Sequence, residues 1–187
     1  MTYHILEETT VFDDFFRIKK AKIKHDLFSS GSVEINRFCF ERGDSVAIVI
    51  YEKDTDSLLF TNQFRYPTVK KTDGWILELT AGSLEADEDP EQRVKIEVEE
   101  EIGYTLTNLV LIGSFFVSPG GSSERVLLYY TEVASTDKVF EGGGMHNEKE
   151  DIQLVKIPVL DTRNKLKNFE FQDAKTLVGL QWFLFNK

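Results

Sequence analysis

Hydrophobic and polar residues alternate over the first part of the chain and then give way to continuous apolar runs. Within residues 1–43, β-branched and aromatic residues are interleaved with polar ones over 15–28 and 33–41, on either side of the turn sequence at 29–32. This spacing is typical of two or three antiparallel strands. The run at 45–52 is almost entirely apolar, which predicts a buried strand.

The rest of the chain predicts further strands and two helices, in the order of a mixed α+β sandwich. A helix is indicated over residues 89–102, because Asp89 is a suitable N-cap, Pro90 suits the first helical position and Gly103 suits the C-cap. Leucines at helical spacing predict a second helix over residues 173–187. The remaining strands are expected at residues 58–67, 74–82, 108–118, 125–134 and 152–159.

Length and composition agree with a small globular protein. The chain has 187 residues, a mass of 21.5 kDa and 41% hydrophobic residues. We divide it into an N-terminal β-strand segment (1–43) and a main domain (44–187). Cys39 is the only cysteine, which excludes an internal disulfide and a cysteine-based zinc site. No apolar run approaches the ~18 residues of a membrane span, and the first residues do not resemble a signal peptide. We therefore expect a soluble, cytoplasmic protein without a membrane partner.

The charge of the chain is strongly negative and unevenly distributed. Lys and Arg number 22 against 32 Asp and Glu, which gives a formal net charge of −10. Such a surface repels polyanions, so we expect no nucleic-acid partner. A small phosphorylated ligand requires a local group of cations. Nine of the seventeen residues from Glu85 to Glu101 are acidic, and this stretch therefore holds most of the functional information.

The predicted acidic helix gathers three carboxylates on one side. At about 100° per residue, Glu97, Glu100 and Glu101 fall within roughly a quarter of the circumference, beside an apolar stripe that includes Val94 and Val98. Neighbouring carboxylates repel each other, and the repulsion grows with burial. Either the acids are solvated, or divalent cations bind between them. Ligands that are all oxygen favour Mg²⁺ or Mn²⁺.

The residues around these acids resemble the Nudix box. That box is a glycine, five residues, Glu, seven residues, and then Arg-Glu-apolar-any-Glu-Glu-any-Gly-apolar. Ile96 stands where the box has arginine, a residue that helps to orient the glutamate at position 100 of this chain. Arg93 lies one turn before Glu97 and could partly substitute for the missing arginine. The other eight defined positions match in register, at Gly82, Glu88, Glu97, Val98, Glu100, Glu101, Gly103 and Tyr104.

The segments that flank the box extend the resemblance to about residues 40–185. The sequences NQFRYP, ILELTAG, SPGGSSER and GGGMHNEKEDIQLVKI are similar to the ADP-ribose pyrophosphatase and GDP-mannose pyrophosphatase branch of the Nudix hydrolases. This resemblance implies a Nudix-type α/β/α sandwich with a mixed sheet, preceded by a small N-terminal antiparallel β-sheet. It also implies Mg²⁺-dependent hydrolysis of a pyrophosphate bond, with Mn²⁺ as an alternative ion.

The same resemblance assigns roles to individual residues. The metal ligands it implies are the backbone carbonyl of Ala81 and the carboxylates of Glu97, Glu101 and Glu150. It implies that Glu148 is the general base and that Glu100 holds a metal-bound water or a second metal. It places five residues in contact with substrate, namely Arg42, Arg65, Ser83, Ser118 and Glu124.

Several of these assignments have a purely structural alternative. Arg65 could be a surface residue at a strand edge, and Glu148 and Glu150 could be ordinary loop acids. The glycines at 142–144 suit a hinge that closes a loop over substrate, but they could form only a tight turn. We expect Trp75 to be buried in the sheet rather than stacked on a base.

Three functional hypotheses follow. The first is a Mg²⁺-dependent nucleoside diphosphate sugar hydrolase that splits ADP-ribose into AMP and ribose 5-phosphate, with GDP-mannose or another nucleotide sugar as the second substrate. The second is a Nudix-fold binding protein without turnover, for which Ile96 is the only support. The third, an unrelated α+β protein, is disfavoured by the match over 23 residues. We also expect a homodimer, because residues 1–43 are too few to form a core alone.

Overall fold

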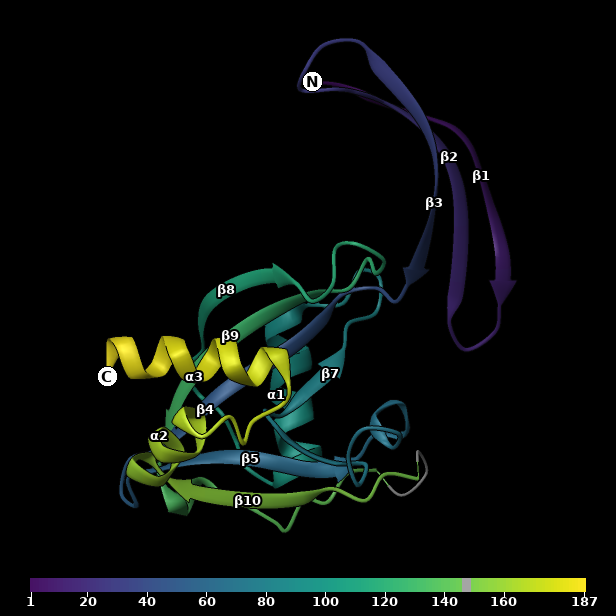
Figure 1. The fold of residues 1–187 in the computed structure, drawn as a ribbon. Coiled ribbons are helices and arrows are strands. Elements are labelled where there is room, and N and C mark those ends of the chain that lie inside the picture. The colour runs from purple at the N-terminus through teal and green to yellow at the C-terminus, as the bar shows by residue number, and fades with distance from the viewer. Residues whose placement is uncertain (146–148) are drawn as a thin grey trace. The chain divides into compact units, whose positions relative to one another are not determined.

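The computed structural model describes residues 1–145 and 149–187 and divides the chain into two compact units (Figure 1). The first unit contains Met1–Asp44 and Phe116–Arg125, and the second contains Ser45–Phe115 and Val126–Lys187. The first unit thus includes a segment that lies far along the chain from its strands. Each unit is described by itself below.

The first unit is a three-stranded antiparallel sheet in the order β1-β2-β3. Its strands are β1 (Tyr3–Asp13), β2 (Arg17–Asp26) and β3 (Ser32–Glu41), which confirms the small N-terminal sheet. The segment 116–125 is attached to β3, since the N–H of Phe40 donates to the carbonyl of Gly121 at 2.7 Å. Every residue of β1 is exposed, so this sheet has no core of its own in a single chain.

The second unit is built on a seven-stranded mixed sheet. The central strand β4 runs parallel to β9 and antiparallel to β5, in the order β10-β5-β4-β9-β8, while β6 pairs with β5 and β7 with β4. The strands of this sheet are β4 (Ser45–Glu52), β5 (Ser57–Phe64), β6 (Trp75–Glu78), β7 (Ala81–Ser83), β8 (Val110–Phe116), β9 (Arg125–Val133) and β10 (Gln153–Pro158).

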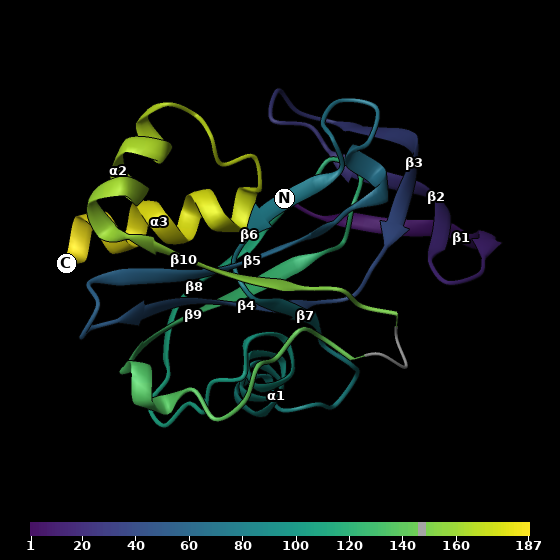
Figure 2. The ribbon, with the colours of Figure 1, turned by 90° about the horizontal axis from the view of Figure 1, so that it is seen from below.

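Helices cover both faces of this sheet, as Figure 2 shows. Helix α1 (Pro90–Ile102) lies on one face, and α2 (Val159–Lys167) and α3 (Ala174–Asn186) lie on the other. Alternate residues of β4 serve the two cores. Val46 and Ile48 pack in the cluster that contains α1, and Ala47 and Val49 pack in the cluster that contains α3. The predicted α+β sandwich with a mixed sheet is therefore confirmed. In the described part of the chain, no helix is long and apolar enough to cross a membrane.

The predicted strand at 74–82 is in fact two short strands. Residues 75–78 pair with β5 and residues 81–83 with β4, so the chain changes partner between them. At the crossing, the N–H of Leu79 donates to Oγ1 of Thr176 at 2.9 Å, and the carbonyl of Thr80 accepts from the N–H of Ile48 at 3.1 Å. The sequence pattern does not reveal this change, because four of the five residues from Ile76 to Thr80 suit a strand and no turn residue interrupts them.

Three other features differ from the predictions. The predicted strand at 58–67 ends at Phe64, because residues 66–68 form a 3₁₀ turn, η1 (Tyr66–Thr68). The prediction of a buried Trp75 is wrong, since the residue is 48% exposed and contacts the Phe64 ring edge to face. Trp75 is the first residue of β6, a strand that pairs along one edge only, with β5. Helix α2 had no predicted counterpart.

Candidate metal and catalytic site

Helix α1 forms where the sequence predicts it, because its start and stop signals are local. The side chain of Asp89 accepts the N–H of Glu91 at 2.9 Å, and Gly103 adopts the left-handed conformation at φ 74°. The stripe of Val94, Val98 and Ile102 is completely buried against the sheet. This apolar contact fixes the rotation of the helix and therefore the direction of its acidic residues.

Two of the three predicted carboxylates on α1 are buried. Glu97 is 7% exposed and Glu101 is 3% exposed, whereas Glu100 is half-buried and Glu99 is exposed. Glu97 forms an ion pair with Arg93. Among the described residues, Oε2 of Glu101 is buried without any hydrogen-bond partner. A buried carboxylate oxygen without a partner is costly, and its position is suitable for a cation.

The electrostatics of these acids also favour a bound cation. Burial raises the pKa of Glu101 well above its usual value, and the nearby carboxylates of Glu97 and Glu150 raise it further. Burial raises the pKa of Glu97 as well, although the Arg93 cation opposes this shift. Burial and mutual repulsion thus disfavour the ionised forms of Glu97 and Glu101, and a bound divalent cation would stabilise those ionised forms.

The backbone of β7 completes the oxygen-rich site. Any side chain at Gly82 would overlap with the carboxylate of Glu97, so glycine allows Glu97 to lie against the strand that carries Ala81. Carboxylate and carbonyl oxygens are the ligands that hard divalent cations prefer. No three His, Cys, Asp or Glu side chains in the described part of the chain form a metal cage. Glu97 pairs with Arg93, and Glu150 accepts a backbone N–H.

The predicted hinge at 142–144 is a turn that is hydrogen-bonded to the end of α1. Gly142, Gly143 and Gly144 have φ values of 73°, 110° and 82°, which disfavour any other residue. The N–H groups of Gly143 and Gly144 donate to the carbonyls of Glu101 and Glu100 at 2.9 and 3.0 Å. The loop is therefore tied to the same helix turn that carries the predicted site acids.

The loop that follows carries Glu150 and Glu148. Oε2 of Glu150 accepts the N–H of Met145 at 3.0 Å, and Glu150 contributes to the raised pKa of both Glu97 and Glu101. Glu150 therefore interacts electrostatically with the two helix acids, and its role as a metal ligand stays a prediction. Glu148 lies outside the described residues, so its role as general base stays a prediction.

The surroundings of Ile96 are both apolar and acidic, since Glu99 and Glu100 also line the cavity beside it. The residue is 41% exposed and, together with Phe140 and Met145, it lines a cavity of about 280 Å³ beside Glu100. It lies outside the core, as its angular position on the helix predicts. The Arg93 cation contacts Glu97 and not Glu100, so it replaces the missing arginine only in part.

The predicted substrate residues fall into both units. Arg42 forms an ion pair with Glu124 at 3.7 Å in the first unit, where Ser118 begins a turn with its carbonyl accepting the N–H of Gly121. In the second unit, Ser83 ends β7, and Arg65 follows β5. Arg65 belongs to the same unit as the helix acids, and its cation opposes the rise in the pKa of Glu101 that burial causes.

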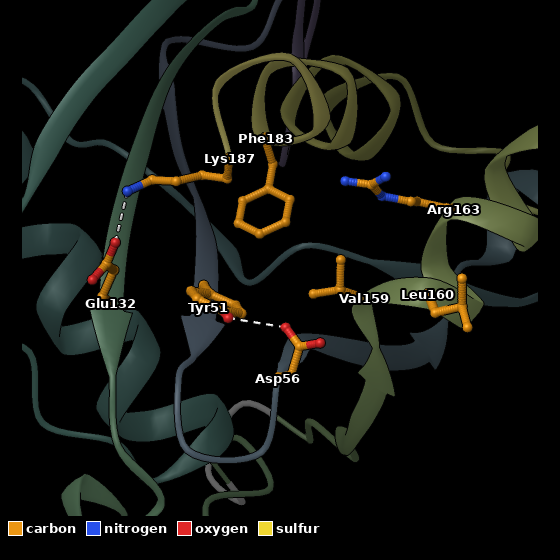
Figure 3. Close-up of a pocket in the computed structure, with 8 residues that line it drawn as sticks. All are labelled: Tyr51, Asp56, Glu132, Val159, Leu160, Arg163, Phe183 and Lys187. Atoms are coloured by element: carbon orange, nitrogen blue, oxygen red, sulfur yellow. Dashed lines mark hydrogen bonds and ion pairs between the residues drawn. The ribbon is translucent and has the colours of Figure 1, made fainter.

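A second cavity lies on the α3 face of the sheet and contains none of the predicted site residues. The cavity has a volume of about 580 Å³. At its edges, Tyr51 is hydrogen-bonded to Asp56, and Glu132 forms an ion pair with Lys187 (Figure 3). Tyr51 and Phe183 pack in the apolar cluster that contains α3, whereas α1 packs in the other cluster. The cavity is therefore separate from the acidic site on α1.

Comparison with known proteins identifies the family. Residues 41–178 match the model of the NUDIX domain, and the chain belongs to this family. It is 32% identical to an ADP-ribose pyrophosphatase of Haemophilus influenzae, over 97% of this chain and 86% of that protein. It is 30% identical to a GDP-mannose pyrophosphatase of Pectobacterium atrosepticum, over 95% of this chain and 91% of that protein.

A solved structure supports the fold independently. The crystal structure of an ADP compounds hydrolase superposes with a TM-score of 0.76 and covers 99% of this chain and 94% of that one. Its sequence identity of 17% makes this a likeness of fold alone. The Nudix-type sandwich expected from the box is thus confirmed, and Nudix hydrolases generally need a divalent metal.

The substitution Glu101→Gln should stabilise the metal-free protein and remove activity. The folded-state pKa of Glu101 is raised, so its ionisation costs stability as the pH rises above the unfolded-state pKa. In EDTA, the variant should melt above the wild type at pH 8, with a smaller difference at pH 5. Turnover should fall about 100-fold or more. Glu99→Gln, an exposed acid on the same helix, is the control. Near-normal turnover of Glu101→Gln at saturating Mg²⁺ would contradict the assignment.

The substitution Ile96→Arg should be tolerated. The side chain is partly exposed beside a cavity, and an arginine there would lie one turn before Glu100. Turnover should stay level or rise severalfold, metal affinity should change little, and the free energy of unfolding should change by less than ~1 kcal/mol. Ile96→Ala separates the added cation from the lost apolar group. Unfolding of Ile96→Arg would mean that Ile96 packs against a neighbouring element.

Proposed function

We propose that this chain hydrolyses the pyrophosphate bond of a nucleoside diphosphate sugar in a Mg²⁺-dependent reaction. ADP-ribose is the first substrate, and the products are AMP and ribose 5-phosphate. The observation that carries the proposal is the pair of buried acids on α1 within a NUDIX domain, Glu97 and Glu101, of which Glu97 lies against Gly82 of β7. The names of the relatives, an ADP-ribose pyrophosphatase and a GDP-mannose pyrophosphatase, support the substrate class.

In this proposal the chain holds the metal through oxygen atoms alone. The carbonyl of Ala81 and the carboxylates of Glu97, Glu101 and Glu150 would bind it, and Arg93 would give up its contact with Glu97. When bound, the divalent ion neutralises charge on the pyrophosphate and lowers the pKa of water. The buried oxygen of Glu101 that has no partner among the described residues supports this assignment.

The remaining residues act on substrate and on the attacking water. Glu148 accepts a proton from that water on its carboxylate, and Glu100 orients the water. Arg65 binds a phosphate through its terminal nitrogens, since a guanidinium is suited to phosphate oxygens. Ser83 lies at the end of the strand that carries Ala81. Arg42, Ser118 and Glu124 would contact the rest of the substrate.

Two alternatives keep specific support. GDP-mannose or another nucleotide sugar is the second substrate, and relatives at similar identity bear the name GDP-mannose pyrophosphatase. A binding protein with impaired turnover is favoured by Ile96 alone, whereas the intact acids of α1 favour an enzyme. A cytoplasmic location stays a prediction from composition.

A phosphate-release assay over a panel of nucleotide sugars with Mg²⁺ tests the proposal. We expect turnover of ADP-ribose first and of GDP-mannose second. Glu148→Gln should reduce turnover by about 100-fold or more, because acid–base assistance is lost. Glu150→Gln should mainly raise the Mg²⁺ concentration that is required. Small and equal effects of both variants would return the general base to α1, and binding without turnover of any sugar would favour the binding protein.

The protein should form a homodimer through its N-terminal sheet. A single-layered sheet needs a partner surface, and this one exposes large apolar side chains in β1, in β3 and in the turns between the strands. They include Tyr3, Phe12, Phe15, Phe28 and Phe38. Light scattering at micromolar concentration should give twice the chain mass, and a species of 21.5 kDa would rule the dimer out.

A further inference from the structure

Glu78, at the end of β6, had no predicted role, yet it binds two cations inside the NUDIX domain. The residue is 3% exposed. Its Oε1 accepts the Nε–H of Arg65 at 2.7 Å, and its Oε2 pairs with Nζ of Lys175. Lys175 also lies 3.1 Å from Oδ1 of Asp173. Both oxygens of this buried carboxylate are therefore occupied by cations from different parts of the chain.

The contact with Glu78 fixes one edge of the Arg65 guanidinium. The backbone N–H of Arg65 donates to the carbonyl of Gly74 at 2.7 Å, so the main chain is held as well. The side chain remains 40% exposed. Because Nε is bound to Glu78, the two terminal nitrogens are the atoms left to meet a ligand. A guanidinium held in this way loses less conformational entropy when it binds a phosphate.

The other cation, Lys175, is fixed by the start of α3. The side chain of Asp173 accepts both the N–H and the Oγ1–H of Thr176, at 2.9 and 2.6 Å. Oγ1 of Thr176 in turn accepts the N–H of Leu79, the residue after Glu78. The first turn of α3 thus anchors the chain segment that carries Glu78, two residues before it reaches Ala81.

We propose that Glu78 is a positioning residue that orients the Arg65 guanidinium for the substrate pyrophosphate, with Lys175 holding the carboxylate in place. The inference rests on the proposed function, because it takes Arg65 as a phosphate contact. It assigns a role in substrate binding to the C-terminal helix, which carries Lys175. Loss of the Glu78 charge should weaken substrate binding more than it slows the chemical step.

A double-mutant cycle on substrate binding tests this proposal. The probe is the non-hydrolysable α,β-methylene analogue of ADP-ribose with Mg²⁺, measured by calorimetry, and the variants are Glu78→Gln, Arg65→Gln and the double variant. Each single substitution should raise the Kd about tenfold or more, and the double variant should be no weaker than Arg65→Gln alone. In the hydrolysis assay, Glu78→Gln should raise KM and change kcat less than about threefold.

Controls separate positioning from a general loss of structure. Glu132 pairs with Lys53 and Lys187 at 3.6 and 2.8 Å in the same unit, so Glu132→Gln removes a matched acid outside the site and should leave the Kd unchanged. If Glu78→Gln does not fold, Glu78→Asp keeps the charge but is one methylene too short to hold both cations. It should give an intermediate Kd.

The possible results distinguish a failure of the positioning role from a failure of the proposed function. Wild-type affinity in Glu78→Gln, or effects of Glu78→Gln and Arg65→Gln that multiply in the double variant, would overturn the positioning role. Turnover of a nucleotide sugar by the wild type reports separately on the proposed function. An unchanged Kd in Arg65→Gln, in a wild type that turns over substrate, would overturn the positioning role and leave the proposed function standing.

Discussion

The burial of the apolar stripe of α1 is the constraint on which the site depends. Val94, Val98 and Ile102 are completely buried, and each such side chain contributes roughly 1.5–3 kcal/mol on leaving water. This gain offsets the cost of carrying Glu97 and Glu101 inward on the same helix. The helix cannot rotate to expose its acids without exposing the stripe. The result is a pair of carboxylates whose pKa values are raised in the absence of a cation.

The end of the same helix organises the neighbouring loop. The last carbonyls of an α-helix lack partners within the helix, and here those of Glu100 and Glu101 accept N–H groups from the glycine turn. The glycines of this turn have positive φ, and the consecutive N–H groups of Gly143 and Gly144 donate to these carbonyls. One helix thus supplies both the acidic side chains and the backbone acceptors that place Glu150 beside them.

Tertiary contacts hold positively charged side chains at the site of this acidic protein. The chain carries a formal charge of −10, and a pyrophosphate substrate needs local positive charge. Arg65 is held by Glu78, and Glu78 is held by Lys175 more than ninety residues further along the chain. The anchoring acid thus holds a cation in the same unit as the acids of α1.

Some features of this protein could be predicted from the sequence because they depend on neighbouring residues. The bounds of α1 follow from Asp89, Pro90 and Gly103. The register of the box marks Glu97 and Glu101 as candidate metal ligands. The burial of strand 45–52 follows from its unbroken apolar run.

Other features were decided only by the tertiary structure, since they depend on partners that are distant in the chain. The division of 74–82 into two strands follows from a change of pairing partner, from β5 to β4. An acid such as Glu78 in a strand could have been noted as unusual, but its two cations lie on other elements. The sequence likewise shows an arginine at 93 and an isoleucine at 96, while only packing reveals that the arginine meets Glu97 and that the isoleucine lines a cavity. Local signals set where α1 begins and ends, whereas long-range contacts divide β6 from β7 and set which side chains meet.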